Sequence, residues 1–189
     1  MRYEFRIYWP PRKESVDACA DKLHRYLLVL SAAGFKHFYK LGWSKKKAMQ
    51  SPIALEIANL RQILSRGVNR RDDDRQPIPE LGFHVSFWAG VKDESQSYRV
   101  SFACGNYHPG FINRGEFKLA TSGACSFDQL GRPTLCRLLI DMVQIWEADC
   151  GVLCATQAKC RYKNGHMEAA NEALLLWQDQ RLTEQWRDA

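Results

Sequence analysis

Residues 3–30 read YEFRIYWPPRKESVDACADKLHRYLLVL, and they contain the two clearest signals of secondary structure in the chain. In residues 3–9 every second side chain is apolar and large, a period of two that predicts a half-buried strand, and Pro10 and Pro11 end it. Ser15 is suited to cap the following helix, whose apolar residues keep helical spacing as far as Leu30. The chain therefore begins with a strand that leads directly into a helix.

Further elements follow the same two patterns. Helices are predicted after Pro52 as far as Gly67, from Pro133 through Trp146 and from His166 to Trp186, with a short helical turn after Ser44. Strands are predicted at residues 83–89 and 98–104, joined as an antiparallel hairpin, and at 116–120 and 152–156; the charged residues 69–79 predict an exposed loop. These elements predict an α+β fold, with a mainly antiparallel sheet and helices packed on it, in a single domain over residues 1–189.

The composition indicates a soluble cytoplasmic protein. Of the 189 residues 46% are hydrophobic and six are Trp, which is enough apolar surface to form a core. No signal peptide or apolar run of membrane-spanning length is visible. The seven cysteines are an odd number in a chain without an export signal, so we expect reduced thiols in the cytoplasm.

The patterns of enzymes and metal sites are not found in this sequence. The best metal candidate combines Cys150, Cys154 and Cys160 with His166, but its spacing matches no usual zinc motif, and buried inert thiols are the favoured interpretation. The histidines are isolated, and no phosphate-binding glycine loop is present. We therefore predict no catalytic residue, no metal and no cofactor, and a protein that is not an enzyme.

Four segments are unusual without being catalytic: Trp9–Ser15 (WPPRKES), Gly42–Ser44 (GWS), Gly67–Asp73 (GVNRRDD) and Leu81–Trp88 (LGFHVSFW). In this order they resemble the immunity protein 52 family of bacterial toxin–immunity systems. The resemblance covers residues 1–105 well and the helix ending at Trp146 more loosely, and it does not extend to the C-terminal segment. It implies a cytoplasmic antidote that binds and neutralises a restriction-endonuclease-like nuclease toxin, often one delivered by type VI secretion, without catalysis.

The residues that carry the resemblance need not contact the toxin. Arg12 with Glu14, and Arg70 with Asp72 or Asp73, could form ion pairs that fix the loops to the sheet. We therefore expect a structural role for the motif residues Trp9, Arg12, Glu14, Ser15, Arg70, Gly82 and Trp88. If Arg12→Ala lowers thermal stability while toxin binding survives, the structural interpretation holds.

The net charge of +6 bears on how a nuclease would be blocked. An antidote that mimics DNA in a basic cleft is expected to be acidic, and this chain is basic. Either a local acidic surface meets the nuclease, or the antidote binds away from the cleft and blocks a conformational or oligomeric step. For the first hypothesis the predicted toxin-binding residues are Asp72, Asp73, Asp74, Glu80, Asp93 and Glu94. A second class of function also stays open, a basic nucleic-acid-binding module that presents Lys45–Lys47 beside Trp43.

Overall fold

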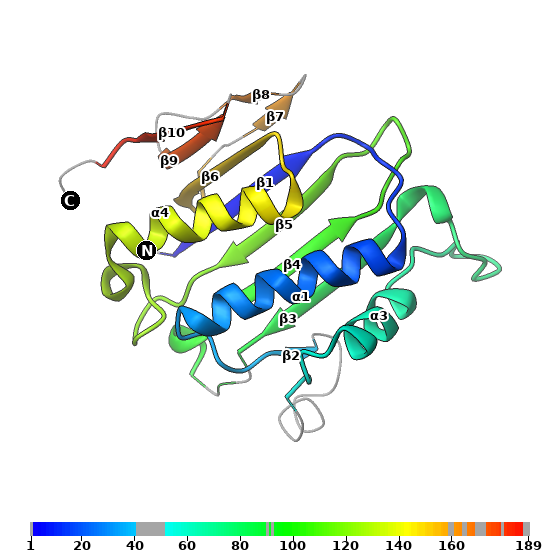
Figure 1. Cartoon of the computed structure of the whole chain (residues 1–189), viewed down its shortest axis with the longest axis horizontal. Helices are drawn as coiled ribbons and strands as arrows, with labels where there is room; N and C mark the ends of the chain where they lie inside the picture. The colour runs from blue at the N-terminus through cyan, green and yellow to red at the C-terminus, as the bar shows by residue number, and fades with distance from the viewer. Residues whose placement is uncertain are drawn as a thin grey trace.

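An antiparallel sheet of eight strands runs through the centre of the protein, with the order β10-β9-β6-β1-β5-β4-β3-β2. The computed structural model describes residues 2–40, 52–89, 91, 93–158, 161–163, 166–168, 173–178 and 180–186. Neighbouring strands of the sheet pair antiparallel throughout, and helices pack on the sheet (Figure 1). The predicted α+β class is confirmed.

The described elements follow one another along the chain in this order: β1 (Tyr3–Trp9), α1 (Val16–Ala32), β2 (Tyr39–Lys40), α3 (Ile57–Arg66), η1 (Pro79–Leu81), β3 (Phe83–Trp88), η2 (Glu94–Gln96), β4 (Arg99–Cys104), β5 (Asn113–Lys118), α4 (Phe127–Trp146), β6 (Cys150–Ala155), β7 (Arg161–Lys163), β8 (His166–Glu168), β9 (Ala173–Gln178) and β10 (Arg181–Glu184).

Strand β1 and helix α1 form as residues 3–30 predict. Phe5, Ile7 and Trp9 are fully buried on the helix side of the sheet. The Ser15 side chain accepts a hydrogen bond from the backbone N–H of Ala18 at 3.1 Å, which caps the first turn of α1. Because β1 pairs with both β5 and β6, it lies well inside the sheet.

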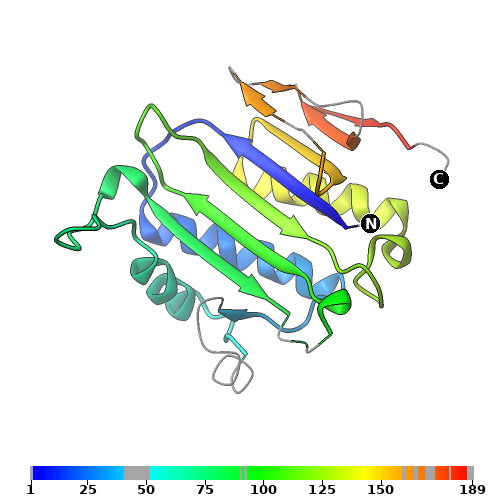
Figure 2. The same ribbon diagram turned by 180° about the vertical axis from the view of Figure 1, so that it is seen from behind.

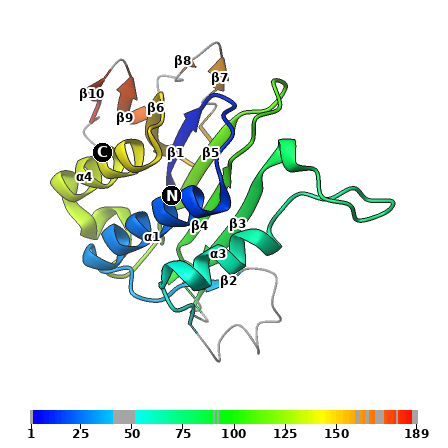
Figure 3. The ribbon, with the colours of Figure 1, turned by 45° about the vertical axis from the view of Figure 1, so that its right-hand side comes forward.

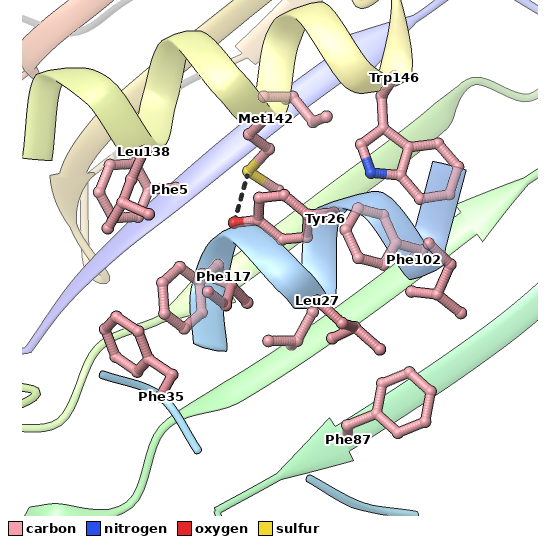
Figure 4. Close-up of a cluster of buried hydrophobic side chains, with 14 of the residues drawn as sticks. Phe5, Tyr26, Leu27, Phe35, Phe87, Phe102, Phe117, Leu138, Met142 and Trp146 are labelled. Atoms are coloured by element: carbon pink, nitrogen blue, oxygen red, sulfur yellow. Dashed lines mark hydrogen bonds between the residues drawn. The ribbon is translucent and has the colours of Figure 1, made fainter. Parts of the chain in front are cut away.

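Helices α1, α3 and α4 lie on one face of the sheet (Figure 3). The core between them is aromatic, and Figure 4 shows part of it. Tyr26 of α1 donates a hydrogen bond to Met142 Sδ of α4 at 3.5 Å. Phe102 of β4 stacks on Trp146 with ring centroids 4.3 Å apart. These contacts join two helices and the sheet into one core.

The opposite face of the sheet is covered differently along its width. Over β6 a second, smaller cluster includes Cys150, Val152 and Cys154, and Tyr162 of β7 stacks there on Tyr8 at 5.5 Å. Over β3, β4 and β5 no described helix or strand lies on this face (Figure 2). The sheet is thus buried on both faces near β6 and open on one face farther along.

The C-terminal prediction was wrong. Residues 166–186 were expected to form an amphipathic helix, but their described parts form β8, β9 and β10. Strand β9 pairs with β6 with a register irregularity, so that Leu175 packs in the main core and Ala173 in the smaller cluster on the other face. The stretch ALLLW has no strict helical or strand period, and pairing with the unoccupied edge of β6 decided its conformation.

Several boundaries also differ from the prediction. Helix α3 begins at Ile57 rather than directly after Pro52, because the backbone N–H of Ile53 bonds to the Phe38 carbonyl at 2.7 Å and holds that segment outside the helix. Strand β5 begins at Asn113, before the expected start at Glu116. Helix α4 includes a turn before Pro133, divided from the rest by Gly131 at φ 70. The turn expected at Ser44 lies outside the described residues.

Among the described helices, none has the length and hydropathy needed to cross a membrane.

Candidate functional site

The segment Trp9–Ser15 makes its charged contacts within the chain. Glu14 Oε1 lies 2.7 Å from Lys22 Nζ and 3.3 Å from Arg12 Nε. Lys22 also reaches Glu147 Oε2 at 2.9 Å, beyond the end of α4. Arg12 donates to the backbone carbonyls of Trp146 at 2.6 Å and Glu147 at 3.3 Å, where a helix end leaves carbonyls without helical partners. These four charged side chains, the Arg12–Glu147 network, tie the junction of β1 and α1 to the end of α4.

Two tryptophans lie beneath this network. Trp9 stacks on Trp146 with centroids 5.3 Å apart, and both side chains are fully buried. The Arg12 guanidinium lies 5.9 Å from the centre of a Trp9 ring, within cation–π range. A buried stack covered by a cation anchors the segment firmly, which supports a structural role for Trp9, Arg12, Glu14 and Ser15.

The third motif segment forms a protruding loop of residues 69–82. The Asn69 side chain donates to the Leu81 carbonyl at 2.7 Å, and Ile78 N–H donates to the Asn69 carbonyl at 2.8 Å. Nearer the tip, Arg71 N–H donates to the Gln76 carbonyl at 2.9 Å. The loop is therefore a narrow hydrogen-bonded projection rather than an open connection.

Arg70 does not form the ion pair that was expected. Residues 69–82 are all described, and among them Arg70 contacts neither Asp72 nor Asp73; its guanidinium donates to the Arg75 carbonyl at 3.0 Å. Arg75 itself adopts φ 59, in the left-handed region of backbone conformation. The carboxylates bond to the backbone instead, Asp74 Oδ1 accepting from Gln76 N–H at 2.9 Å.

Gly82 joins the loop to β3. Its φ is 60, and a Cβ there would collide with the Cys104 carbonyl oxygen and the backbone of residues 105 and 106. A glycine is required for both reasons. Trp88, at the far end of β3, is half-buried beside Tyr39 with ring centroids 6.2 Å apart.

The six predicted acidic contact residues fall into two groups. Asp72–Asp74 and Glu80 are exposed at the start of β3. Asp93 and Glu94 lie in the connection between β3 and β4, at the other end of the hairpin. A strand of six residues separates the two groups by roughly 20 Å. The structure thus brings four of these residues to one end of the sheet, called here the acidic end, and does not bring the other two to them.

The acidic end also carries apolar side chains that the sequence analysis missed. The β4–β5 connection is held against η1 by bonds from Tyr107 N–H and His108 N–H to the Glu80 carbonyl, at 3.0 and 3.1 Å. On this connection Phe111 is 54% exposed and Ile112 is 38% exposed. Exposed aromatic and aliphatic side chains next to charged ones are typical of protein interfaces. In the sequence, this apolar surface was indicated only by the pair Phe111 and Ile112 within a glycine-containing turn.

The open sheet face was missed as well. A shallow polar depression of about 90 Å³ is lined by His84, Arg99, Ser101, Arg114 and Glu116, with parts of Phe102 and Ala103. Polar residues alternate along 99–103 and 114–118, and every second side chain of these strands points away from the helices. This alternation was the sequence signal for a polar sheet face.

Two buried thiols of the described chain have raised pKa values. The pKa of Cys104 is raised by a hydrogen bond with Cys19 and by burial, and burial raises the pKa of Cys150 to about 12. Both thiols are protonated at neutral pH and are poor nucleophiles. Within the described residues no group of three metal-ligating side chains converges; Cys160 lies outside them.

The structure combines a sheet with helices on one face, a polar open face, and a rigid projecting loop at one end, an architecture suited to presenting surface to another molecule. The chain matches the model of the immunity protein 52 family over residues 2–180, and it belongs to this family. The match extends well past the expected limit near Trp146 and includes β9. No curated protein matches the chain. Family membership supports toxin neutralisation, a role that immunity proteins usually perform by binding.

Proposed function

We propose that the protein binds a cognate nuclease toxin in the cytoplasm and neutralises it stoichiometrically. Membership of the immunity protein 52 family supports the class of activity. A restriction-endonuclease-like toxin delivered by a type VI secretion system is the partner implied by the resemblance of the motif segments. The whole chain, residues 1–189, acts as one domain in this proposal.

The observation that carries the proposal is the projecting loop with three consecutive exposed carboxylates. Asp72, Asp73 and Asp74 lie at its tip, and the backbone hydrogen bonds of the loop hold them in place before any partner arrives. A pre-ordered contact loses less conformational entropy on binding. Together with Glu80 these carboxylates can meet a basic nuclease surface. Asp93 and Glu94 take part only if the partner spans the sheet.

Charge reversal at the loop tests this proposal. The toxin is sought in the open reading frame beside the gene, and its affinity is measured for Asp72→Lys/Asp74→Lys, for Asp93→Lys/Glu94→Lys and for Glu56→Lys, an exposed carboxylate before α3. We expect the loop variant to bind at least about tenfold more weakly, mainly through slower association. Unchanged affinity at low salt would contradict the loop contact.

The nucleic-acid alternative has a separate readout. Lys45–Lys47 and Trp43 lie outside the described residues. A gel-shift series over increasing salt distinguishes the two functions, because electrostatic DNA binding falls steeply with salt. Binding of DNA by the purified protein at physiological salt would favour the alternative.

A further inference from the structure

The sheet face opposite the helices carries an excess of positive charge. By the alternation of the strands, the charged side chains that β1, β4 and β5 place on this face are Arg6, Arg99, Arg114 and Lys118, with the anions Glu4 and Glu116. Glu4 is 2% exposed and is ion-paired with Arg6 and with Lys118, whose Nζ lies 3.4 Å from its Oε2. The charge near β1 is therefore largely satisfied within the chain, whereas the charge over β4 and β5 is not.

Two arginines flank the depression on β4 and β5. Arg99 forms no ion pair and no side-chain hydrogen bond with any described residue, and it is exposed. Arg114 is 56% exposed and meets Glu116 only at a long 3.8 Å. Burial lowers the pKa of His84 in this depression, and the positive charges of Arg114 and Arg99 lower it further, with Glu116 opposing. Two guanidinium groups against one carboxylate leave the lining of the depression with a net positive charge.

We propose that the open sheet face, centred on Arg99 and Arg114, binds an acidic segment of the partner toxin. This inference rests on the proposed function. A guanidinium binds a carboxylate through paired hydrogen bonds and keeps its charge at any physiological pH, so both groups are suited to Asp or Glu side chains. Between them, Ser101 and Glu116 supply polar atoms that can orient backbone N–H or hydroxyl groups of the same segment.

A nucleic acid strand is a poorer match for this face. Glu116 lies between the two arginines, opposite Ser101 in the strand register, and would face the phosphates. Binding of single strands also relies on aromatic side chains free to stack on bases. Here Tyr8 is already stacked on Tyr162, and Trp88 lies beside Tyr39 at the margin of the sheet. A peptide can place its carboxylates at the two arginines and a neutral group opposite Glu116, and it needs no aromatic side chain to stack on.

The open sheet face and the acidic end require opposite charges on the surface of one partner. A toxin that contacts both must present basic groups to Asp72–Asp74 and acidic groups to Arg99 and Arg114, which fixes its orientation.

Paired charge reversals test the inference. The affinity of the toxin is measured by calorimetry for Arg99→Glu/Arg114→Glu and for Lys36→Glu/Arg66→Glu, whose exposed cations lie off this face and have no ion pair among the described residues. We expect the first variant to bind at least about tenfold more weakly and the control to stay within about twofold of the wild type. Equal affinities for wild type and face variant would overturn the inference and leave the proposed function intact. Thermal unfolding checks both folds, and Arg99→Gln/Arg114→Gln replaces the first variant if the glutamates disturb the sheet.

A second experiment distinguishes failure of this inference from failure of the proposed function. If the wild-type protein binds no toxin, the proposed function is overturned, and the face is then probed with a synthetic glutamate-rich peptide and a single-stranded DNA oligonucleotide. The readout is the NMR shift of the arginine Nε–H signals. Shifts at Arg99 and Arg114 with the peptide support an acidic polypeptide ligand. No shift with the peptide, or shifts with the DNA alone, would overturn it.

Discussion

Lys22 is a buried cation held between two carboxylates, Glu14 and Glu147, and Arg12 closes the same network from the β1 side. Burying charge is unfavourable unless each group has partners, so removal of one member leaves the others poorly compensated. The network holds the two chain segments that flank the Trp9–Trp146 stack. Loss of one of these side chains should therefore lower the stability of the fold, although the network lies away from the acidic end.

Arg12→Ala should lower the free energy of unfolding by about 1–3 kcal/mol, because two hydrogen bonds to carbonyls at the end of α4 and the ion pairs with Glu14 and Glu147 are lost. Urea unfolding measures the effect. Toxin binding by the folded variant should be unchanged. A variant of wild-type stability that no longer binds the toxin would show instead that Arg12 is a contact residue.

Glu147 gives the network a dependence on pH. Hydrogen bonding from Lys22, followed by its positive charge, holds the pKa of Glu147 below its ordinary value of 4.5. A lowered carboxyl pKa stabilises the fold above the ordinary value, and this contribution is lost as pH falls through 4.5 toward the folded-state pKa. The free energy of unfolding, measured at a series of pH values, should fall less steeply below pH 4.5 in Glu147→Gln than in the wild type. Parallel pH profiles for the two proteins would contradict the assignment.

Gly82 and Gly34 both have positive φ, but only Gly82 has backbone atoms where a Cβ would stand. Gly34→Ala should therefore lower stability by about 1 kcal/mol through conformation alone, and Gly82→Ala by clearly more, at least about 2 kcal/mol. Thermal and urea unfolding compare the two variants directly. Equal losses would mean that the loop can move away from Cys104 without difficulty.

Among the elements, β9 departs most from its predicted conformation. A buried strand edge at β6 was available for pairing, and Leu175 enters the main core while Leu174 and Leu176 are half-buried. The local sequence ALLLW permits either structure, because apolar residues stand at nearly every position. In contrast, β1, α1, β3 and β4 formed as predicted, since their apolar periods are strict and each ends at a proline, a glycine or a polar turn.

The strand assignment of β9 makes a prediction about its side chains. Leu175→Ala should lower the free energy of unfolding by about 2–4 kcal/mol, because the side chain is fully buried. Leu176→Ala is the matched control, because Leu176 lies opposite Val152 in the register, on the other face, and is only half-buried, so its loss should be smaller. Equal large losses at both positions would argue against this placement of the two side chains.

At the scale of the whole molecule, the net charge of +6 conceals an uneven surface. Four carboxylates gather at the acidic end, in a loop that also exposes Arg70, Arg71 and Arg75. On the open sheet face Arg99 has no ion pair among the described residues, and Arg114 has only the long one to Glu116. The first group was predicted from the sequence, together with Asp93 and Glu94, which stand at the far end of the hairpin. The second group was not predicted, because Arg99 and Arg114 line one depression only through the pairing of β4 with β5, in which Arg99 lies opposite Lys118 and Arg114 opposite Ala103.

The sequence by itself determined the α+β class, the first strand and helix, the central hairpin and the family motifs, because these depend on local periods, caps and turn residues. Only the tertiary structure decided which charges meet and how the C-terminal residues fold. Glu14 reaches Lys22 within one segment, but it shares that cation with Glu147, more than a hundred residues away. Such contacts, like the pairing of β9 with β6, form between residues that are far apart in the sequence. No local sequence pattern predicts them.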